Sequence, residues 1–335
     1  MAEPAPPLAA RLADYLASAW GEAVDVKDIE RFHGGAARET FRLRAVTASE
    51  ERWLVLRRDP PASLISTERA VEFHALQRAH AAGIPVPRPL MLETRPQAFG
   101  APGFLMEAIA GGRASGLFEE DPYGEARAET GHGLVEALGR LHRLVPDDSD
   151  LRVLPFQDAA GRLAHWRLEI ERNALGPEPV AAAALRWLER HLPPPSGPPA
   201  IVHGDFRSGN FLVDSDNRLL AILDWEMAHV GDPYEDLAWL ADPLWAHGTT
   251  GLVGAMIPFD AMIRIWREHS HRRFDPQLFA WWRLFAGVQG LAIWITSGHE
   301  VAHMKGVDPV LAFSALYPYR AHNASVARLL KDMAA

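Results

Sequence analysis

The sequence of 335 residues contains no cysteine. Disulfide bonds, thiolate nucleophiles and cysteine-ligated metal sites are therefore excluded, and any chemistry must use oxygen or nitrogen groups. Long apolar runs are also lacking, since the longest, 284–295, is interrupted by Gln289 and is shorter than the roughly 20 residues that span a bilayer. The first residues include neither a basic segment nor an apolar segment. We therefore expect no signal peptide, a cytoplasmic location and no membrane partner.

Positive charge is also in short supply. The chain has 34 Lys and Arg against 43 Asp and Glu, a formal net charge of −9. Such a chain matches a polyphosphate backbone poorly, so nucleic acid is not an expected partner. Most of the excess lies in residues 108–335, which carry 21 basic and 29 acidic side chains. This acidity could attract a cationic ligand or serve only solubility.

Residues 1–107 have the pattern of a small β-rich lobe. The composition is that of a globular protein, with 48% hydrophobic residues, and the length predicts two lobes rather than one core. One amphipathic helix is expected at 64–82. The expected strands are 29–33, 40–46, 52–58, 89–93 and 103–108. Together they predict a five-stranded antiparallel sheet with one helix.

Residues 108–335 have a mainly helical pattern with a short β insert. The expected helices are 124–144, 158–175, 179–191, 236–240, 257–269, 276–297 and 312–330. The expected strands of the insert are 200–202, 211–213 and 219–223. The sequence therefore predicts an α+β protein with an N-lobe at 1–107 and a larger C-lobe at 108–335.

The β insert carries the polar residues that are typical of phosphoryl transfer. In 201–214, IVHGDFRSGNFLVD, Asp205 is followed five residues later by Asn210, and Asp224 ends the last strand of the insert. One carboxylate can orient an acceptor hydroxyl and take its proton. An amide oxygen and a second carboxylate can hold Mg²⁺, which prefers hard oxygen ligands. Taken singly, Asp205 and Asp224 could also be turn residues.

These motifs resemble the aminoglycoside phosphotransferase and choline kinase-like family, relatives of the protein kinases. The resemblance covers 34–240 motif by motif and is greatest to the branch associated with acyl-CoA dehydrogenases. It implies a bilobal protein-kinase-like fold. It also implies transfer of phosphate from ATP, with Mg²⁺, to a hydroxyl of a small-molecule acceptor, and GTP remains an alternative donor.

The resemblance also implies roles for the residues of the insert. Asp205 would be the catalytic base or the residue that orients the hydroxyl. Because Arg207 is close to this base, we expect it to be catalytic as well. Asn210 and Asp224 would bind Mg²⁺. His203 would brace the loop.

A glycine-containing turn of the N-lobe lies where a kinase-like fold covers the phosphates. Glycines let backbone N–H groups approach phosphate oxygens closely, although Gly-Gly between strands is also an ordinary hairpin turn. The candidate nucleotide-binding residues of this turn are Gly34, Gly35, Ala36, Arg38 and Thr40.

The lysine that grips the phosphates in kinases has no counterpart here. Kinases pair a lysine of the third strand with a helix glutamate, but none of the three lysines of this chain lies in 52–58. Arg57 stands at the matching position, with Glu72 as its expected partner and Glu68 as the competitor. An arginine grips phosphate as a planar fork, so activity should survive with altered geometry. Because Arg57 replaces the lysine, a weak or inactive nucleotide-binding pseudokinase remains an alternative function.

Other positions follow from the same resemblance. Glu107 and Ile109 would offer backbone groups to the adenine at the hinge between lobes. Asp232 and Asp236 are expected to be loop and helix-cap residues rather than ligands.

A metal-dependent hydrolase that uses His203, Asp205 and Asp224 is a further alternative, although a single histidine argues against zinc.

The acceptor is left open between two classes. An aminoglycoside or aminoalcohol cation would need carboxylates near Asp205, whereas a hydroxyacyl compound would need an apolar channel with a basic rim. The resemblance favours the hydroxyacyl compound slightly. The sequence specifies no oligomeric state.

Overall fold

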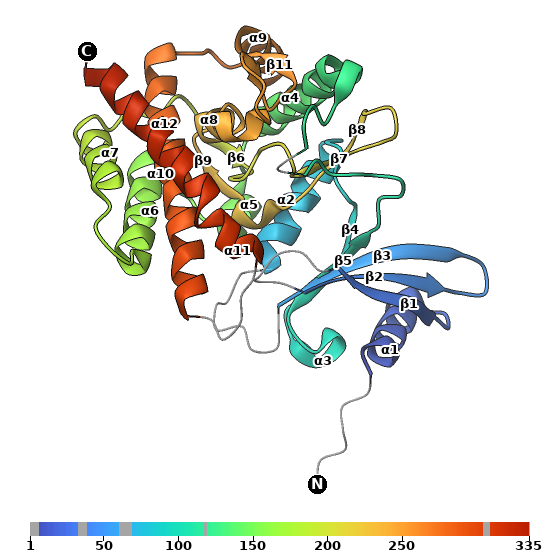
Figure 1. The fold of residues 1–335 in the computed structure, drawn as a ribbon. Helices are drawn as coiled ribbons and strands as arrows, with labels where there is room; N and C mark the ends of the chain where they lie inside the picture. The colour runs from blue at the N-terminus through green and yellow to red at the C-terminus, as the bar shows by residue number, and fades with distance from the viewer. Residues whose placement is uncertain (1–6, 33–38, 60–68, 117–118, 304–308, 335) are drawn as a thin grey trace. The chain divides into compact units, whose positions relative to one another are not determined.

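The computed structural model describes residues 7–32, 39–59, 69–116, 119–303 and 309–334. It divides into two compact units (Figure 1). Unit 1 comprises Met1–Gly111 and Ala221–Glu226, and unit 2 comprises Gly112–Leu220 and Met227–Ala335. The first boundary lies close to the expected one at 107. The short segment Ala221–Glu226, which carries Asp224, belongs with unit 1 rather than with the helical part, contrary to the division expected from the sequence.

Unit 1 contains the expected five-stranded antiparallel sheet. Its strands are β1 (Asp25–Phe32), β2 (Glu39–Val46), β3 (Glu51–Arg58), β4 (Pro89–Glu93) and β5 (Gly103–Glu107), in the order β1-β2-β3-β5-β4. Side chains of β2 alternate between buried and half-buried, as expected for a sheet with one face on a core. The β2–β3 register places Thr40 opposite Arg57, and the β3–β5 register places Leu56 opposite Leu105.

The helices of unit 1 differ in part from the expectation. The expected helix is α2 (Arg69–Ala81), and the start expected at 64 lies outside the described residues. Two helices were not expected, namely α1 (Leu8–Trp20) and the short α3 (Pro96–Phe99). Leu12 and Leu16 of α1 are fully buried in the core cluster of the sheet. Their spacing of one helical turn was a signal that the sequence offered.

Unit 2 is mainly helical. Its helices are α4 (Arg127–Arg143), α5 (Asp148–Val153), α6 (Ala159–Asn173), α7 (Pro179–Arg190), α8 (Tyr234–Leu240), α9 (Phe259–Ser270), α10 (Pro276–His303), α11 (Pro309–Ser314) and α12 (Tyr317–Ala334). The 3-10 turns η1 (Gly124–Ala126) and η3 (Pro243–Ala246) also belong to it. The single helix expected at 312–330 is thus two helices, and α12 restarts with Pro318 in its first turn.

Helix α10 is the centre of unit 2. It packs against α6, α7, α8, α11 and α12, and α10 and α12 lie side by side in Figure 1. By length and composition α10 could cross a membrane, but 72% of its most apolar window is buried inside the protein. This burial is typical of the central helix of a helical domain.

The β insert forms two short sheets. Strand β6 (Ala200–Val202) pairs antiparallel with β9 (His229–Gly231), and β7 (Phe211–Val213) pairs with β8 (Leu219–Ile222). Strand β9 was not expected from the sequence. A further pair, β10 (Leu252–Val253) with β11 (Ile257–Pro258), precedes α9. All strands of the expected insert are present, and β6 leads directly into the segment that begins with His203.

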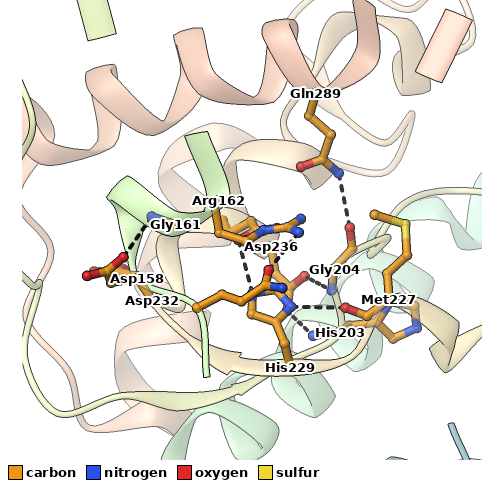
Figure 2. A network of polar contacts seen from close by, with 12 residues as sticks. Asp158, Gly161, Arg162, His203, Gly204, Met227, His229, Asp232, Asp236 and Gln289 are labelled. Carbon is orange, nitrogen blue, oxygen red and sulfur yellow. Dashed lines mark hydrogen bonds and ion pairs between the residues drawn. The ribbon is translucent and has the colours of Figure 1, made fainter. Parts of the chain in front are cut away.

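A buried ion cluster supports the β6–β9 pair. Arg162 Nε lies 3.0 Å and 3.1 Å from the two carboxylate oxygens of Glu235, and His229 Nε2 lies 3.2 Å from Glu235 Oε2. His229 Nδ1 donates to the Met227 carbonyl (Figure 2). Burial opposes the charge of Glu235, but the cations Arg162 and His229 hold its pKa at about 2, below the ordinary 4.5.

Glu235→Gln should destabilise unit 2 and remove part of its acid sensitivity. Because the carboxyl pKa is lower in the folded chain, its contribution is complete above about pH 4.5 and is lost as the pH falls towards 2. The lowering of the Glu235 pKa from 4.5 to about 2 corresponds to about 3 kcal/mol of unfolding free energy, at roughly 1.4 kcal/mol per pKa unit. Chemical unfolding of the wild type and the variant between pH 7 and pH 3 measures this.

The matched control is Glu189→Gln, which breaks an exposed ion pair with Arg167 and should change the unfolding free energy by less than about 1 kcal/mol. Equal acid dependence of Glu235→Gln and the wild type would contradict the assignment.

Candidate active site

The segment 203–210 is held by a buried carboxylate of α8. The backbone N–H groups of His203 and Gly204 donate to Asp236 at 2.8 Å and 2.9 Å, and the Asp236 side chain is fully buried (Figure 2). Trp266 Nε1 donates to His142 Nδ1 at 2.9 Å, so the proton of the neutral ring lies on Nε2, which donates to Asp236 at 3.0 Å. Burial lowers the pKa of His142, which keeps this ring neutral. Asp236 therefore anchors the loop and is not the helix-cap residue that the sequence suggested.

Asp232, in contrast, has the expected loop and cap contacts. Its carboxylate accepts from the backbone N–H of Tyr234 at 3.0 Å and from the N–H and hydroxyl of Ser196, each at 2.9 Å.

Gly204 can only be glycine in this geometry. Its φ is +83°, and an added Cβ would lie 2.5 Å from the Met227 carbonyl oxygen. Gln289 of α10 donates to the Gly204 carbonyl at 3.1 Å (Figure 2). The loop backbone is thus fixed by α8 on one side and by α10 on the other.

His203 has the contacts expected of a residue that braces the loop. The Asp205 N–H donates to His203 Nδ1 at 3.2 Å, and the fully buried ring packs edge-on against Phe206. In the part of the chain that the structure describes, no cluster of three or more His, Asp or Glu side chains is arranged to hold a metal.

The Asp205 carboxylate accepts hydrogen bonds on both oxygens. Arg207 Nε donates to Oδ1 at 3.1 Å, and Trp239 Nε1 donates to the same oxygen at 2.6 Å. Asn210 Nδ2 donates to Oδ2 at 2.6 Å. The side chain is 16% exposed, so it is oriented and still accessible. Trp239 lies 34 residues further along the chain, and no local pattern in the sequence indicates this contact.

Arg207 is itself held in place. Besides Asp205 it donates to the Ser208 carbonyl at 3.0 Å, and its guanidinium stacks over the Trp245 ring at 4.5 Å. Such stacking stabilises a cation at a partly exposed position. The sequence places Arg207 near Asp205, and the structure brings the two side chains together.

The amide group of Asn210 is fixed by its nitrogen. Its Nδ2 is committed to the Asp205 carbonyl at 2.9 Å as well as to Asp205 Oδ2. No described residue donates to its amide oxygen. An amide oxygen fixed in this way fits the hard oxygen ligands that Mg²⁺ prefers.

In unit 1, Arg57 joins two acidic side chains. Its NH1 is bonded to Glu72 of α2, the partner expected from the sequence, and its NH2 donates to Asp224 Oδ1 at 3.0 Å. The second contact was not expected. Burial opposes the charge of Arg57, but Glu72 and Asp224 outweigh it and raise the pKa of Arg57 above its ordinary value. Glu68, the competing partner, lies outside the described residues.

Arg69 extends this ion network. It donates to Glu72 Oε2 at 2.9 Å and to Asp59 Oδ1 at 2.8 Å. Arg69 and Glu72 are 3% and 2% exposed. The Glu72 carboxylate is therefore shared by two arginines and cannot turn away from Arg57 without losing both.

Asp224 adopts a left-handed backbone conformation, with φ +66°. Aspartate tolerates this conformation better than most residues. Its side chain is 36% exposed, and the backbone before it is fixed where Ile222 N–H donates to the Pro85 carbonyl at 2.8 Å. Its carboxylate is a second hard oxygen donor of the kind that Mg²⁺ binds.

The remaining nucleotide-binding candidates fall into three groups. Gly34, Gly35, Ala36 and Arg38 lie outside the described residues. Thr40 is the cross-strand neighbour of Arg57. The Glu107 N–H donates to the Arg88 carbonyl at 2.9 Å, and the expected pairing of Glu107 and Ile109 backbone groups with adenine stays a prediction. The backbone groups of Ile109 make no hydrogen bond to a described residue.

A cavity of about 380 Å³ lies in unit 2. Its size is that of a small-molecule pocket. Its polar lining side chains are Glu119, Glu120, Asp242, His247, Tyr317, His322, Ser325 and Arg328. Acidic and basic groups both face it, and Leu244, Ala321 and Ala324 add apolar surface.

Two histidines connect this cavity to segment 203–210 and to Trp239. His247 Nε2 lies 3.0 Å from the Ser208 hydroxyl, and its Nδ1 lies 3.1 Å from the Glu119 carbonyl. Burial lowers the pKa of His247. The His322 ring packs against Trp239 with 6.0 Å between centroids. His247 of the cavity lining thus contacts Ser208, and His322 of the lining contacts the Trp239 indole that donates to Asp205.

Curated relatives match part of the chain. Acyl-CoA dehydrogenase family member 11 of Gallus gallus is 28% identical over 63% of this chain, and the chain spans 27% of its length. Aminoglycoside 3'-phosphotransferase of Escherichia coli is 31% identical over 41% of this chain and 50% of its own length.

Solved structures share the kinase-like fold. A protein of Ralstonia eutropha provisionally described as an aminoglycoside phosphotransferase superposes with a TM-score of 0.75 at 19% identity, over 96% of this chain and 98% of its own. Choline kinase of Streptococcus pneumoniae gives a TM-score of 0.61 at 13% identity, over 94% and 97%. The expected α+β kinase-like fold is confirmed.

The family model described as the phosphotransferase enzyme family matches residues 28–285, a range that includes Arg57, Asp205, Asn210 and Asp224. The chain belongs to this family of phosphotransferases.

Proposed function

We propose that this phosphotransferase is a kinase that uses ATP and Mg²⁺ to phosphorylate a hydroxyl group of a small molecule. The observation that carries the proposal is the Asp205 carboxylate. Three donors orient it on a loop whose backbone is anchored by Asp236 and Gln289. A carboxylate fixed and accessible in this way is suited to bind an acceptor hydroxyl.

Asp205 would align the acceptor and receive its proton. The acceptor oxygen forms a bond to the γ-phosphorus of ATP, the bond from that phosphorus to the β,γ-bridging oxygen breaks, and ADP leaves. The hydroxyl proton passes to Asp205. Most of the rate would come from positioning and charge neutralisation rather than from strong base catalysis.

Asn210 and Asp224 would supply oxygen ligands for Mg²⁺, and Arg57 would bind phosphate oxygens. Bound Mg²⁺ neutralises charge on the phosphate oxygens during transfer. Nucleotide use is supported by solved structures of spectinomycin phosphotransferase with ADP and of aminoglycoside 2'-phosphotransferase with GDP. We propose ATP as the donor, with GTP as the competing donor.

One observation favours a second function, a nucleotide-binding pseudokinase. Arg57 stands where kinases have lysine, and it is bonded to Asp224. If this bond persists with nucleotide bound, one oxygen of Asp224 is withheld from the metal. Such a protein would bind nucleotide without transferring phosphate.

We propose that the non-reacting part of the acceptor occupies the cavity of unit 2, since His247 links this cavity to the catalytic loop. We favour a hydroxyacyl compound, because curated relatives that match 63% and 82% of this chain are named acyl-CoA dehydrogenase family members. The lining carboxylates Glu119 and Glu120 favour the competing class, amine-bearing acceptors.

MgATP should raise the unfolding temperature. A ligand at about 100 times its Kd adds roughly 2.7 kcal/mol, which is a shift of several degrees for domains of this size. Thermal unfolding is compared with MgATP, with MgGTP and with ATP plus EDTA. We expect the largest shift with MgATP. No shift at millimolar nucleotide would contradict both the kinase and the pseudokinase.

The metal dependence of this shift should require Asp224. Asp224→Asn should abolish the difference between MgATP and ATP plus EDTA, because a ligand of the metal is lost. Glu226→Gln is the matched control, since Glu226 lies 3.7 Å from the same arginine but is not a proposed ligand. A full MgATP shift in Asp224→Asn would refute the role of Asp224.

Asp205→Asn should reduce ADP release by about 100-fold or more and leave the MgATP thermal shift intact, because the hydroxyl loses its proton acceptor. ADP release is measured with a panel of aminoglycosides, aminoalcohols and hydroxyacyl thioesters. Asp216→Asn, at an exposed position, is the control. Undiminished turnover in Asp205→Asn would disprove the catalytic role. MgATP binding without acceptor-dependent ADP release would favour the pseudokinase.

Ala324→Trp should raise the acceptor KM at least several-fold and leave the KM for ATP unchanged, because a large ring would fill the proposed acceptor cavity. Ala324 is exposed on α12 and lines this cavity. The control is Ala327→Trp, at an exposed position of the same helix outside the lining. If both variants have the acceptor KM of the wild type, the acceptor binds elsewhere.

A further inference from the structure

Trp239 makes an unusual contact for a buried tryptophan. Its ring is 1% exposed, and its single N–H donates to Asp205 Oδ1 at 2.6 Å. An indole has only this one donor, so Trp239 commits its whole hydrogen-bonding capacity to the catalytic carboxylate. Trp282, in comparison, is fully buried, and its Nε1 has no partner among the described residues.

Helix α8 holds the loop at two points. Asp236 accepts from the loop backbone at His203 and Gly204, and Trp239, three residues later, donates to the side chain of Asp205. Residues three apart lie on the same face of a helix. One face of α8 therefore fixes both the backbone of the loop and the direction of its carboxylate.

The position of the Trp239 ring is set by packing. Its edge contacts the Trp245 ring at 5.2 Å between centroids, with 69° between planes. Trp245 also stacks against the guanidinium of Arg207. The two donors to Asp205 Oδ1, Arg207 Nε and Trp239 Nε1, thus share one aromatic support.

The two oxygens of Asp205 are not equivalent as a result. A carboxylate oxygen has two lone pairs, and those of Oδ1 are taken by Arg207 and Trp239. Among the described residues, only Asn210 donates to Oδ2. One lone pair of Oδ2 therefore remains for another donor.

We propose that Trp239 is a positioning residue that reserves Asp205 Oδ2 for the acceptor hydroxyl. The proposal rests on the proposed function, in which Asp205 receives the hydroxyl proton. Because its ring is 1% exposed, Trp239 would act through Asp205. Without its N–H, only Arg207 would donate to Oδ1, and the carboxylate would be held less tightly about its Cβ–Cγ bond.

The test compares Trp239→Phe with Trp282→Phe. Each variant replaces a buried indole by a smaller ring, but only the first removes a donor to Asp205. We expect Trp239→Phe to lower kcat by about 10- to 100-fold with the KM for ATP unchanged, whereas Trp282→Phe retains the wild-type kcat. Turnover is followed as ADP release, with the acceptor panel and with water as the acceptor.

A spectroscopic measurement tests the hydrogen bond without activity. In the protein labelled with ¹⁵N-tryptophan, the indole resonance missing from Trp239→Phe belongs to Trp239. We expect it downfield of the Trp282 resonance, as for a strong hydrogen bond, and shifted upfield in Asp205→Ala. A packing role alone would leave this resonance unmoved in Asp205→Ala.

The outcomes separate this proposal from the proposed function. Full turnover in Asp205→Asn overturns the proposed function. Loss of turnover in Asp205→Asn together with a wild-type kcat in Trp239→Phe overturns only the role of Trp239. An indole resonance that does not respond to Asp205→Ala overturns it as well, whether or not an acceptor is found.

Discussion

The site depends on one buried charge, the carboxylate of Asp236. An ionised carboxylate removed from water costs several kcal/mol unless donors replace its hydration. Here two backbone N–H groups of the loop and one ring N–H of His142 take that place. Any other course of the loop would leave the charge without these donors. The electrostatics of α8 therefore determine where His203, Gly204 and Asp205 lie.

In unit 1, Arg57 holds two carboxylates in place. Its planar guanidinium bonds Glu72 through one terminal nitrogen and Asp224 through the other. A lysine would present one compact charge to both carboxylates and would lack the fork geometry. The replacement of lysine by Arg57 thus goes together with a direct contact between β3 and Asp224, two residues after the end of β8.

The sequence allowed prediction of the features that depend on local pattern. Alternating apolar residues marked the strands of the sheet, and the spacing of Asp205, Asn210 and Asp224 marked the polar set. Contacts between residues distant in the chain could not be predicted in this way. Asp236 meets His203 at a separation of 33 residues, and Trp239 meets Asp205 at 34. A tryptophan in a helical run indicates burial but does not reveal which atom its N–H will meet.

The division of unit 1 into two chain segments affects how the protein is made. Ala221–Glu226 supplies the N–H that bonds Pro85 and the carboxylate that bonds Arg57. During synthesis, these six residues leave the ribosome only after more than a hundred residues of unit 2. Domains commonly complete their folding in order from the N-terminus. Unit 1 cannot follow that order, because its ion network closes only when the chain has been translated past Glu226.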